Sequence, residues 1–111
     1  MITVETLSNY GANTKEGIER CMNNEEFYIM LVNKALSDDK LTKLQQQLIE
    51  KDLDAAFETA HALKGMYSNL SLDPLTKPIS EMTELLRSRC DVDYGEYMAE
   101  AEKQFAALTA L

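Results

Sequence analysis

Apolar residues recur at spacings of three and four along most of the chain, which is the pattern of amphipathic helices. The clearest example is the stretch 52–72, DLDAAFETAHALKGMYSNLSL, which we expect to form one long helix with Asp52 as its N-cap. Its apolar seam consists of Ala56, Ala60, Leu63, Tyr67 and Leu70. A seam of this kind is typical of a helix that packs inside a bundle.

Helix start signals divide the rest of the chain into further helices. Capping residues predict helices over 3–9, 13–21, 23–36 and 40–50, and Asp73-Pro74 and Asp93 predict two more starts. We expect these side chains to face inward: Ile18, Cys21, Met22, Phe27, Leu31, Ala35, Leu41, Leu44, Leu48, Leu75, Ile79, Met82, Leu86, Tyr94, Met98, Ala101, Phe105 and Leu108. Tyr28 and Val32 would lie beside that face, and Pro78 would kink the first turn of its helix.

The chain shows no strand alternation, no repeat and no linker. The connection between the helices 40–50 and 52–72 is so short that the two should pack antiparallel. We therefore predict an all-α fold, an antiparallel up-and-down bundle with a four-helix core and short N-terminal helices packed against it. At 111 residues, the whole chain (1–111) should be a single domain.

Composition and charge narrow the function classes. Hydrophobic residues make up 45% and charged residues 27%, which is typical of a soluble globular protein. The net charge of −8 makes nucleic acid and anionic membrane poor partners. The chain has neither a membrane-spanning apolar run nor a signal peptide, so we expect a cytoplasmic protein. Cys21 and Cys90 should be free thiols, although a single bridge between them remains open.

The only histidine, His61, falls on the helix flank that faces water, roughly 140° from the seam. Gly65 stacks one turn further along, and Phe57 and Ser68 border the same patch. A glycine inside a helix costs about 1 kcal/mol relative to alanine. Its use here would be to let a partner's backbone approach the imidazole. Lys64 lies between the patch and the seam, where it could neutralise an anion carried by the ring.

The run Ala60-His61-Ala62-Leu63-Lys64-Gly65, followed by Asn69-Leu70, resembles the A-H-x-L-K-G signature of the histidine-containing phosphotransfer (HPt) domain. The resemblance implies that His61 is phosphorylated on a ring nitrogen. It also implies exchange of that group with an aspartate of a response-regulator receiver domain, and a histidine kinase as a further partner.

The chain departs from the family pattern after the glycine. The family often has small residues there and a second glycine after the Asn-Leu pair, where this chain has Met66, Tyr67 and Ser71. The two larger side chains would alter packing, and Ser71 would lengthen the end of the helix. None of the three belongs to the constellation of His61, Lys64 and Gly65.

We therefore expect a phosphorelay intermediate rather than an enzyme, because the chain has no phosphate-binding loop, catalytic triad or metal cluster. His61 would accept the phosphoryl group, Lys64 would neutralise its charge, and Phe57, Gly65 and Ser68 would contact the partner. We expect no cofactor on this chain, since the resemblance places the acceptor carboxylate and Mg²⁺ on the receiver. The domain should be a monomer, and Met1 with the compact length favours a free-standing one.

Other interpretations remain open. The bundle could be an interaction module that binds a receiver or kinase through the same surface without phosphorylation; an independent kinase or phosphatase is a weaker alternative. Phe57 is first of all a residue at the edge of the core, and Ser68 has an equal claim to be a plain surface serine. Gly65 could serve close helix packing, although its place on the outer flank argues against that.

Overall fold

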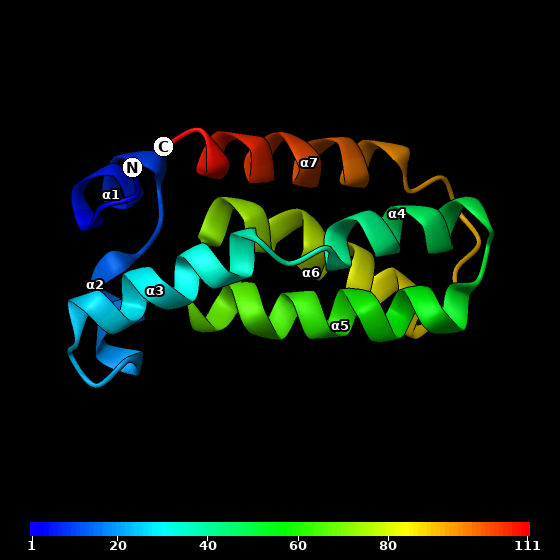
Figure 1. Cartoon of the computed structure of the whole chain (residues 1–111). Helices are drawn as coiled ribbons and strands as arrows, with labels where there is room; N and C mark the ends of the chain where they lie inside the picture. The colour runs from blue at the N-terminus through cyan, green and yellow to red at the C-terminus, as the bar shows by residue number, and fades with distance from the viewer.

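The computed structural model describes residues 1–111 and contains seven helices and no strand (Figure 1). In chain order they are α1 (Val4–Tyr10), α2 (Thr14–Arg20), α3 (Glu25–Leu36), α4 (Lys40–Ile49), α5 (Leu53–Asn69), α6 (Asp73–Arg87) and α7 (Gly95–Thr109). The all-α fold predicted from the apolar spacing is confirmed.

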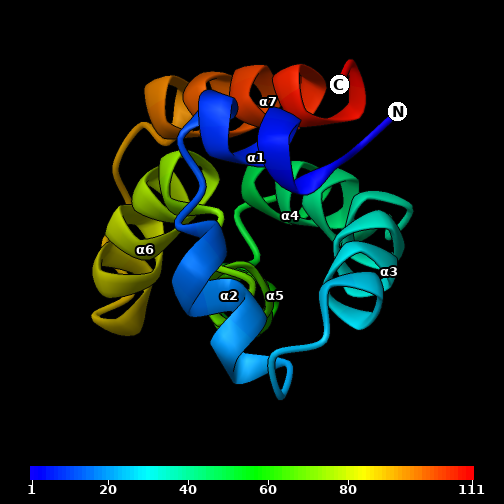
Figure 2. The same ribbon diagram turned by 90° about the vertical axis from the view of Figure 1, so that its left-hand side faces the viewer.

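Helices α4 to α7 form the up-and-down bundle, in which α5 packs between α4 and α6, and α6 packs against α7. The two short N-terminal helices lie at one end of this bundle (Figure 2). There α1 lies beside the C-terminal end of α7, because the Met1 amino group donates to the Leu111 carbonyl at 2.7 Å. The Tyr10 hydroxyl also donates to Gln104 Oε1, at 2.8 Å. The four-helix core with packed N-terminal helices is therefore as predicted.

The seam of α5 is buried along its whole length. Ala56, Ala60 and Leu63 are fully buried, and Tyr67 and Leu70 are at most 5% exposed. The predicted inward residues of α6 and most of those of α7 join them in one core: Leu75, Ile79, Met82, Leu86, Tyr94, Met98, Ala101 and Leu108. Phe105 is only partly buried against that core.

Helix α2 docks on the C-terminal end of α5. Gly17 allows this approach, since a Cβ there would lie 2.5 Å from Tyr28 Cε1 and 3.0 Å from the Leu70 carbonyl oxygen. The Tyr28 hydroxyl in turn donates to that carbonyl at 2.8 Å, and burial raises the pKa of Tyr28 to about 12. Arg20 of α2 donates to the Ser68 carbonyl at 2.6 Å and to Ser71 Oγ at 3.1 Å.

The structure explains why a glycine would suit position 71. Ser71 has a φ of 54°, in the left-handed region that favours glycine. Our expectation that Ser71 lengthens the helix is wrong, because α5 ends at Asn69 and Leu70 is its C-cap. The long helix predicted over 52–72 is thus shorter at its end, and the chain turns sharply through Ser71 into α6.

Three of the predicted caps form the expected hydrogen bond and three are displaced. The seventh, Asp39 of the predicted cap Ser37-Asp38-Asp39, is the N-cap of α4 but makes no side-chain capping hydrogen bond. Thr3, Asn13 and Asp52 each accept a hydrogen bond from the backbone three residues on. The N-cap of α3, however, is Asn24 rather than Asn23, which has a φ of 59° in the preceding turn.

The other two displaced starts lie at α6 and α7. Leu72 is the N-cap of α6, so that Asp73 and Pro74 are its first two residues. Asp93 does not cap α7; its carboxylate accepts from the Gly95 backbone at 2.8 Å and leaves Tyr94 as N-cap.

Some side chains predicted to face inward do not. Met22 is 85% exposed, because the turn after α2 places it at a φ of 57° with its side chain in solvent. Phe27 is 38% exposed and Leu31 is only partly buried, whereas Tyr28 and Val32 are fully buried. The buried face of α3 therefore consists of Tyr28, Val32 and the predicted Ala35, and Tyr28 packs against Gly17 of α2.

Further predictions can be compared with the structure. Pro78 is buried inside α6, which continues through it as one helix. Leu48 packs against the core from a partly buried position, whereas Leu41 and Leu44 are buried. Both cysteines are free thiols, so the bridge that the sequence left open does not form. None of the helices combines the length and the apolar character that crossing a membrane requires.

Candidate functional site

His61 lies near the middle of α5 and is exposed, as its position on the helical wheel predicts. One turn earlier, the partly buried ring of Phe57 stacks on the imidazole, with ring centroids 5.5 Å apart and planes 9° apart. No hydrogen bond within the chain involves His61, so both ring nitrogens remain free for chemistry or for a partner. Phe57 is at the edge of the core, as expected, and its ring also stacks on the imidazole; its contact with a partner stays a prediction.

The end of α6 and the turn after it bring two arginines, Arg87 and Arg89, to the Phe57 ring. The guanidinium carbon of Arg89 lies 4.7 Å from the Phe57 ring centroid, and that of Arg87 lies 5.2 Å from it. Such distances are typical of cation–π contacts. Arg89 is held firmly, because it donates to Asp54 Oδ1 at 2.6 Å and to the Leu86 carbonyl at 2.8 Å. We did not identify either arginine from the sequence.

Lys64 is partly buried and forms an ion pair with α6. Its Nζ lies 3.4 Å from Glu84 Oε1, and the other oxygen of that carboxylate accepts from Arg87 Nε at 3.2 Å. The hydrogen bond from Arg87, and then the one from Lys64, hold the pKa of Glu84 below its usual range. The lysine that could neutralise an anion on His61 therefore shares a carboxylate with Arg87 in this structure.

The contacts between α5 and α6 follow an antiparallel register. Glu84 faces Lys64, Arg87 and Arg89 lie over Phe57, and Arg89 reaches Asp54 at the start of α5. The sequence feature from which Glu84, Arg87 and Arg89 could have been predicted is the short connection after Asn69. This connection forces α6 to return along α5. In an antiparallel hairpin with so short a connection, the last turn of α6 lies beside the first half of α5.

Gly65 faces open space, since no atom lies within 4 Å of the position that a Cβ would occupy. It is therefore not a packing glycine, in contrast to Gly17. Ser68 is less central than we expected. Its hydroxyl donates to the Gly65 carbonyl at 3.3 Å, and it lies two helical turns from His61. Of the five predicted residues, Phe57, His61, Lys64 and Gly65 come together, and Ser68 borders them from further along the helix.

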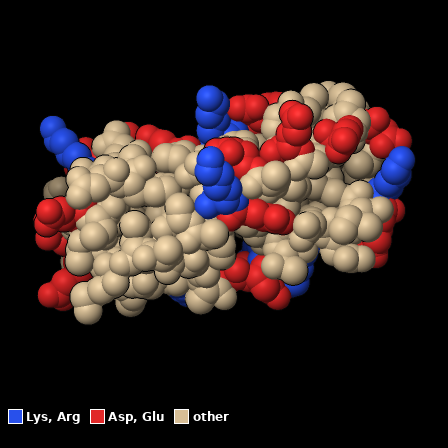
Figure 3. All heavy atoms as spheres, turned by 90° about the horizontal axis from the view of Figure 1, so that it is seen from above, with Lys and Arg blue, Asp and Glu red and all other residues tan.

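The charge around His61 differs from that of the molecule as a whole. The chain carries a net charge of −8, and the face seen from the α7 side is mostly acidic among its charged residues (Figure 3). Helix α5 lies on the other side of the bundle from α7 (Figure 1). There Lys64 follows His61 on the same helix, and Arg87 and Arg89 lie over the Phe57 ring that stacks on the imidazole. Each of these cations is paired with a carboxylate. This arrangement could receive an anion if those pairs exchanged partners.

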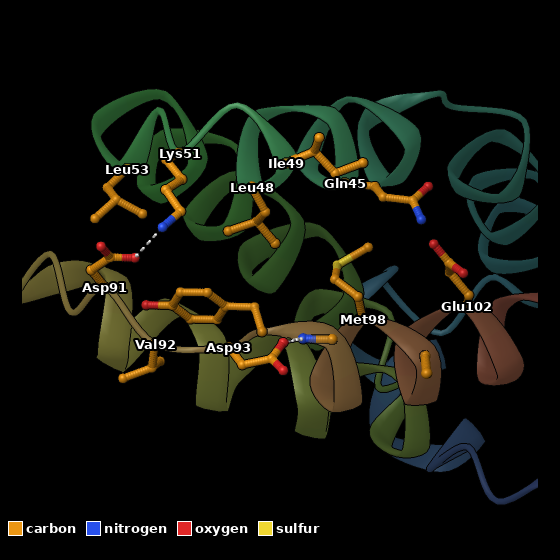
Figure 4. Close-up of a pocket in the computed structure, with 13 residues that line it drawn as sticks. Gln45, Leu48, Ile49, Lys51, Leu53, Asp91, Val92, Asp93, Met98 and Glu102 are labelled. Carbon is orange, nitrogen blue, oxygen red and sulfur yellow. Dashed lines mark hydrogen bonds and ion pairs between the residues drawn. The ribbon is translucent and has the colours of Figure 1, made fainter.

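A sizeable hollow of the molecule lies elsewhere. A cavity of about 710 Å³ opens between α4, the start of α5 and the start of α7, at the end of the bundle far from α1 and α2 (Figure 4). Leu48 and Met98 point toward one another into it, and Lys51 pairs with Asp91 across one end at 3.7 Å. None of the five predicted residues lines this cavity. His61 lies on an exposed helix surface, outside this cavity.

No three His, Cys, Asp or Glu side chains come together in a way that could hold a metal ion. The charged side chains around Phe57 and Lys64 instead form pairs of opposite sign.

Comparison with known proteins identifies a family for most of the chain. The family model described as the Hpt domain matches residues 34–111, which include the end of α3 and all of α4 to α7. No curated protein and no solved structure matches the chain. The matched region holds His61 and every side chain that contacts it or its neighbours from α6, and it covers well over half of the chain. The chain therefore belongs to the Hpt domain family.

Proposed function

We propose that this chain is a phosphorelay intermediate that carries a phosphoryl group on His61 and exchanges it with an aspartate of a response-regulator receiver domain. Hpt domains act in histidine phosphotransfer in two-component systems, together with response regulators and kinases. The observation that carries the proposal is the exposed imidazole without a hydrogen-bond partner, stacked on Phe57. Lys64 lies one turn away, and Arg87 and Arg89 lie over the Phe57 ring, in a chain that is acidic as a whole.

The transfer step needs little from this domain beyond the nucleophile. The lone pair of one imidazole nitrogen attacks the phosphorus of an aspartyl phosphate, and an N–P bond forms. The bond from phosphorus to the aspartate oxygen breaks, and its electron pair leaves with the carboxylate. The other ring nitrogen keeps its proton. Neutral imidazole is well suited to this attack because its pKa normally lies close to 7.

The surface around His61 suits a partner that completes the reaction. Phosphoryl transfer depends mainly on in-line positioning and on stabilisation of charge. Phe57 fixes the plane of the imidazole, and the open surface at Gly65 lets another backbone approach within one helical turn of it. The receiver would supply the aspartate and Mg²⁺, so that the chain acts as a carrier and not as an enzyme by itself. We infer that it works as a monomer in the cytoplasm.

A second function, binding a receiver or kinase through this surface without phosphorylation, has one observation in its favour. All three cations near His61 already have carboxylate partners within the chain. In such a module the imidazole would be a contact residue only, and its chemistry would be irrelevant to the partner's affinity.

Labelling distinguishes the two functions. The chain is incubated with a panel of receiver domains that carry a radioactive aspartyl phosphate, and the label on the chain is followed. We expect a label that is lost in acid and retained in alkali, as a phosphoramidate should be. His61→Gln should abolish it and leave the helix content unchanged, because the side chain is exposed and makes no hydrogen bond.

Label that persists in His61→Gln would move the chemistry to another residue. Receiver binding without any label on the parent chain would instead favour the interaction module.

A further inference from the structure

We propose that Glu84 tunes the stability of phosphorylated His61 by occupying Lys64 and Arg87, the two cations that the phosphoryl group would otherwise bind. This inference rests on the proposed phosphotransfer. It assigns Glu84 as a positioning residue that acts through the two cations rather than by touching the reacting atoms.

The geometry places Glu84 between the two cations. One of its oxygens lies 3.4 Å from Lys64 Nζ and the other lies 3.2 Å from Arg87 Nε. Lys64 is one turn after His61 on α5, and Arg87 lies over the Phe57 ring that stacks on His61. A single carboxylate thus holds both Lys64, which follows His61 on α5, and Arg87, which lies over the ring stacked on the imidazole.

Arg89 does not share this arrangement. It is anchored by Asp54 and by the carbonyl groups of Leu86 and Arg87, so it serves to hold Phe57 in place. Arg87, by contrast, uses only its Nε in a hydrogen bond and leaves both Nη atoms available. Lys64 makes a single hydrogen bond, to Glu84 Oε1, and this bond is long, at 3.4 Å. These two are therefore the cations that can change partner with little loss.

A phosphoryl group on His61 would compete with Glu84 for them. It carries more negative charge than a carboxylate and offers three acceptor oxygens, so Lys64 and Arg87 would be drawn toward it. Glu84 opposes this exchange, because its own charge would be left beside another anion. The carboxylate therefore limits how tightly the chain holds the phosphoryl group, which favours passing it on to a receiver aspartate.

Replacing the carboxylate with an amide of the same shape gives the sharpest test. Glu84→Gln should shift the equilibrium of label between receiver and chain toward the chain by about two- to fivefold, since all partners are at the surface. Glu81→Gln is the matched control: it removes the same charge from an exposed position of α6, one turn earlier, that makes no ion pair. We expect no shift there. The shift in Glu84→Gln should shrink at high salt, because screening weakens exposed pairs.

A second pair of variants tests whether Glu84 acts through the cations. In a chain that already carries Lys64→Ala and Arg87→Ala, Glu84→Gln should leave the partition of label unchanged. A shift that survives in that background, or one equal to that of Glu81→Gln, would overturn the assignment. If the parent chain takes no label from any receiver, both this inference and the proposed function fail. If the parent is labelled and the two glutamine variants behave alike, only the role of Glu84 fails.

Discussion

The two faces of α5 are built on different principles. The inner face consists of Ala56, Ala60, Leu63 and Tyr67, all of which are essentially inaccessible to solvent. The outer face presents Phe57, His61 and Gly65, and what surrounds them comes largely from α6. Burial of apolar side chains determines which residues form the inner face. Ion pairs between α5 and the end of α6 determine the surroundings of the outer face. A change to the inner face should therefore alter stability, and a change to the outer face should alter transfer.

The largest effect on the stability side of this comparison should come from Leu63→Ala. Leu63 is fully buried, and truncating a buried leucine typically costs about 2–5 kcal/mol of unfolding free energy through lost contacts and the cavity left behind. The measurement is denaturant unfolding followed by circular dichroism. Phosphoryl transfer per folded molecule should be unchanged, since the side chain faces away from the imidazole.

His61→Gln provides the opposite case for the same measurement. Its unfolding midpoint should match that of the parent, whereas its labelling should be lost. If Leu63→Ala lost transfer activity while remaining folded, or if His61→Gln were destabilised by a comparable amount, the division between the two faces would not hold.

The next effect is on docking, through Gly65→Leu. Replacing a glycine inside a helix should raise the unfolding free energy by about 0.5–1 kcal/mol, and an added side chain meets no atom of this chain. It would, however, project where a receiver must approach His61, so the transfer rate should fall by about tenfold or more, because small displacements from in-line geometry are costly. Stopped-flow or quenched transfer kinetics together with thermal unfolding would test both parts.

Gly65→Ala is the matched control, since its single methyl group improves helix propensity with little obstruction. Transfer in Gly65→Leu at the parent rate would show that the receiver does not approach over this position. Gly17 offers a contrast, because a Cβ there collides with Tyr28, and alanine should destabilise the fold while leaving the His61 surface intact.

The inner face could be predicted from the sequence because periodicity along one helix is enough to define it. All five seam residues of α5 and all four predicted core positions of α6 are buried. The prediction failed where another element decides the outcome. Tyr28 rather than Phe27 is buried because α2 brings Gly17 against it, and Met22 points outward because its turn adopts a left-handed conformation.

The site shows the same limit. Phe57, His61 and Gly65 are spaced four residues apart on one helix, so their proximity follows from the sequence alone. Glu84, Arg87 and Arg89 are about twenty or more residues away in the chain, and their approach depends on the register of α6 against α5. Arg89 also reaches Phe57 only because the chain turns at a φ of 53° after α6, which no periodicity indicates.

The smallest expected effect comes from Lys64→Ala. The lysine is one turn from His61, but Glu84 already binds it and Arg87 remains as a second cation, so its loss should change the transfer rate or equilibrium only severalfold. Helix propensity is preserved by alanine. The effect should shrink as ionic strength rises, because exposed charges are screened. The measurement is transfer by Lys64→Ala and the parent at low and high salt.

Lys64→Ala is also measured in a chain that carries Glu84→Gln. There the lysine is released from its ion pair, so Lys64→Ala should cost more than it does in the parent, and the difference is the coupling between the two residues. Equal losses in both backgrounds would show that Glu84 does not restrain the lysine. A loss of transfer in Lys64→Ala that is the same at low and high salt would point to packing. The partly buried side chain of Lys64 would then matter through its aliphatic part and not through its charge.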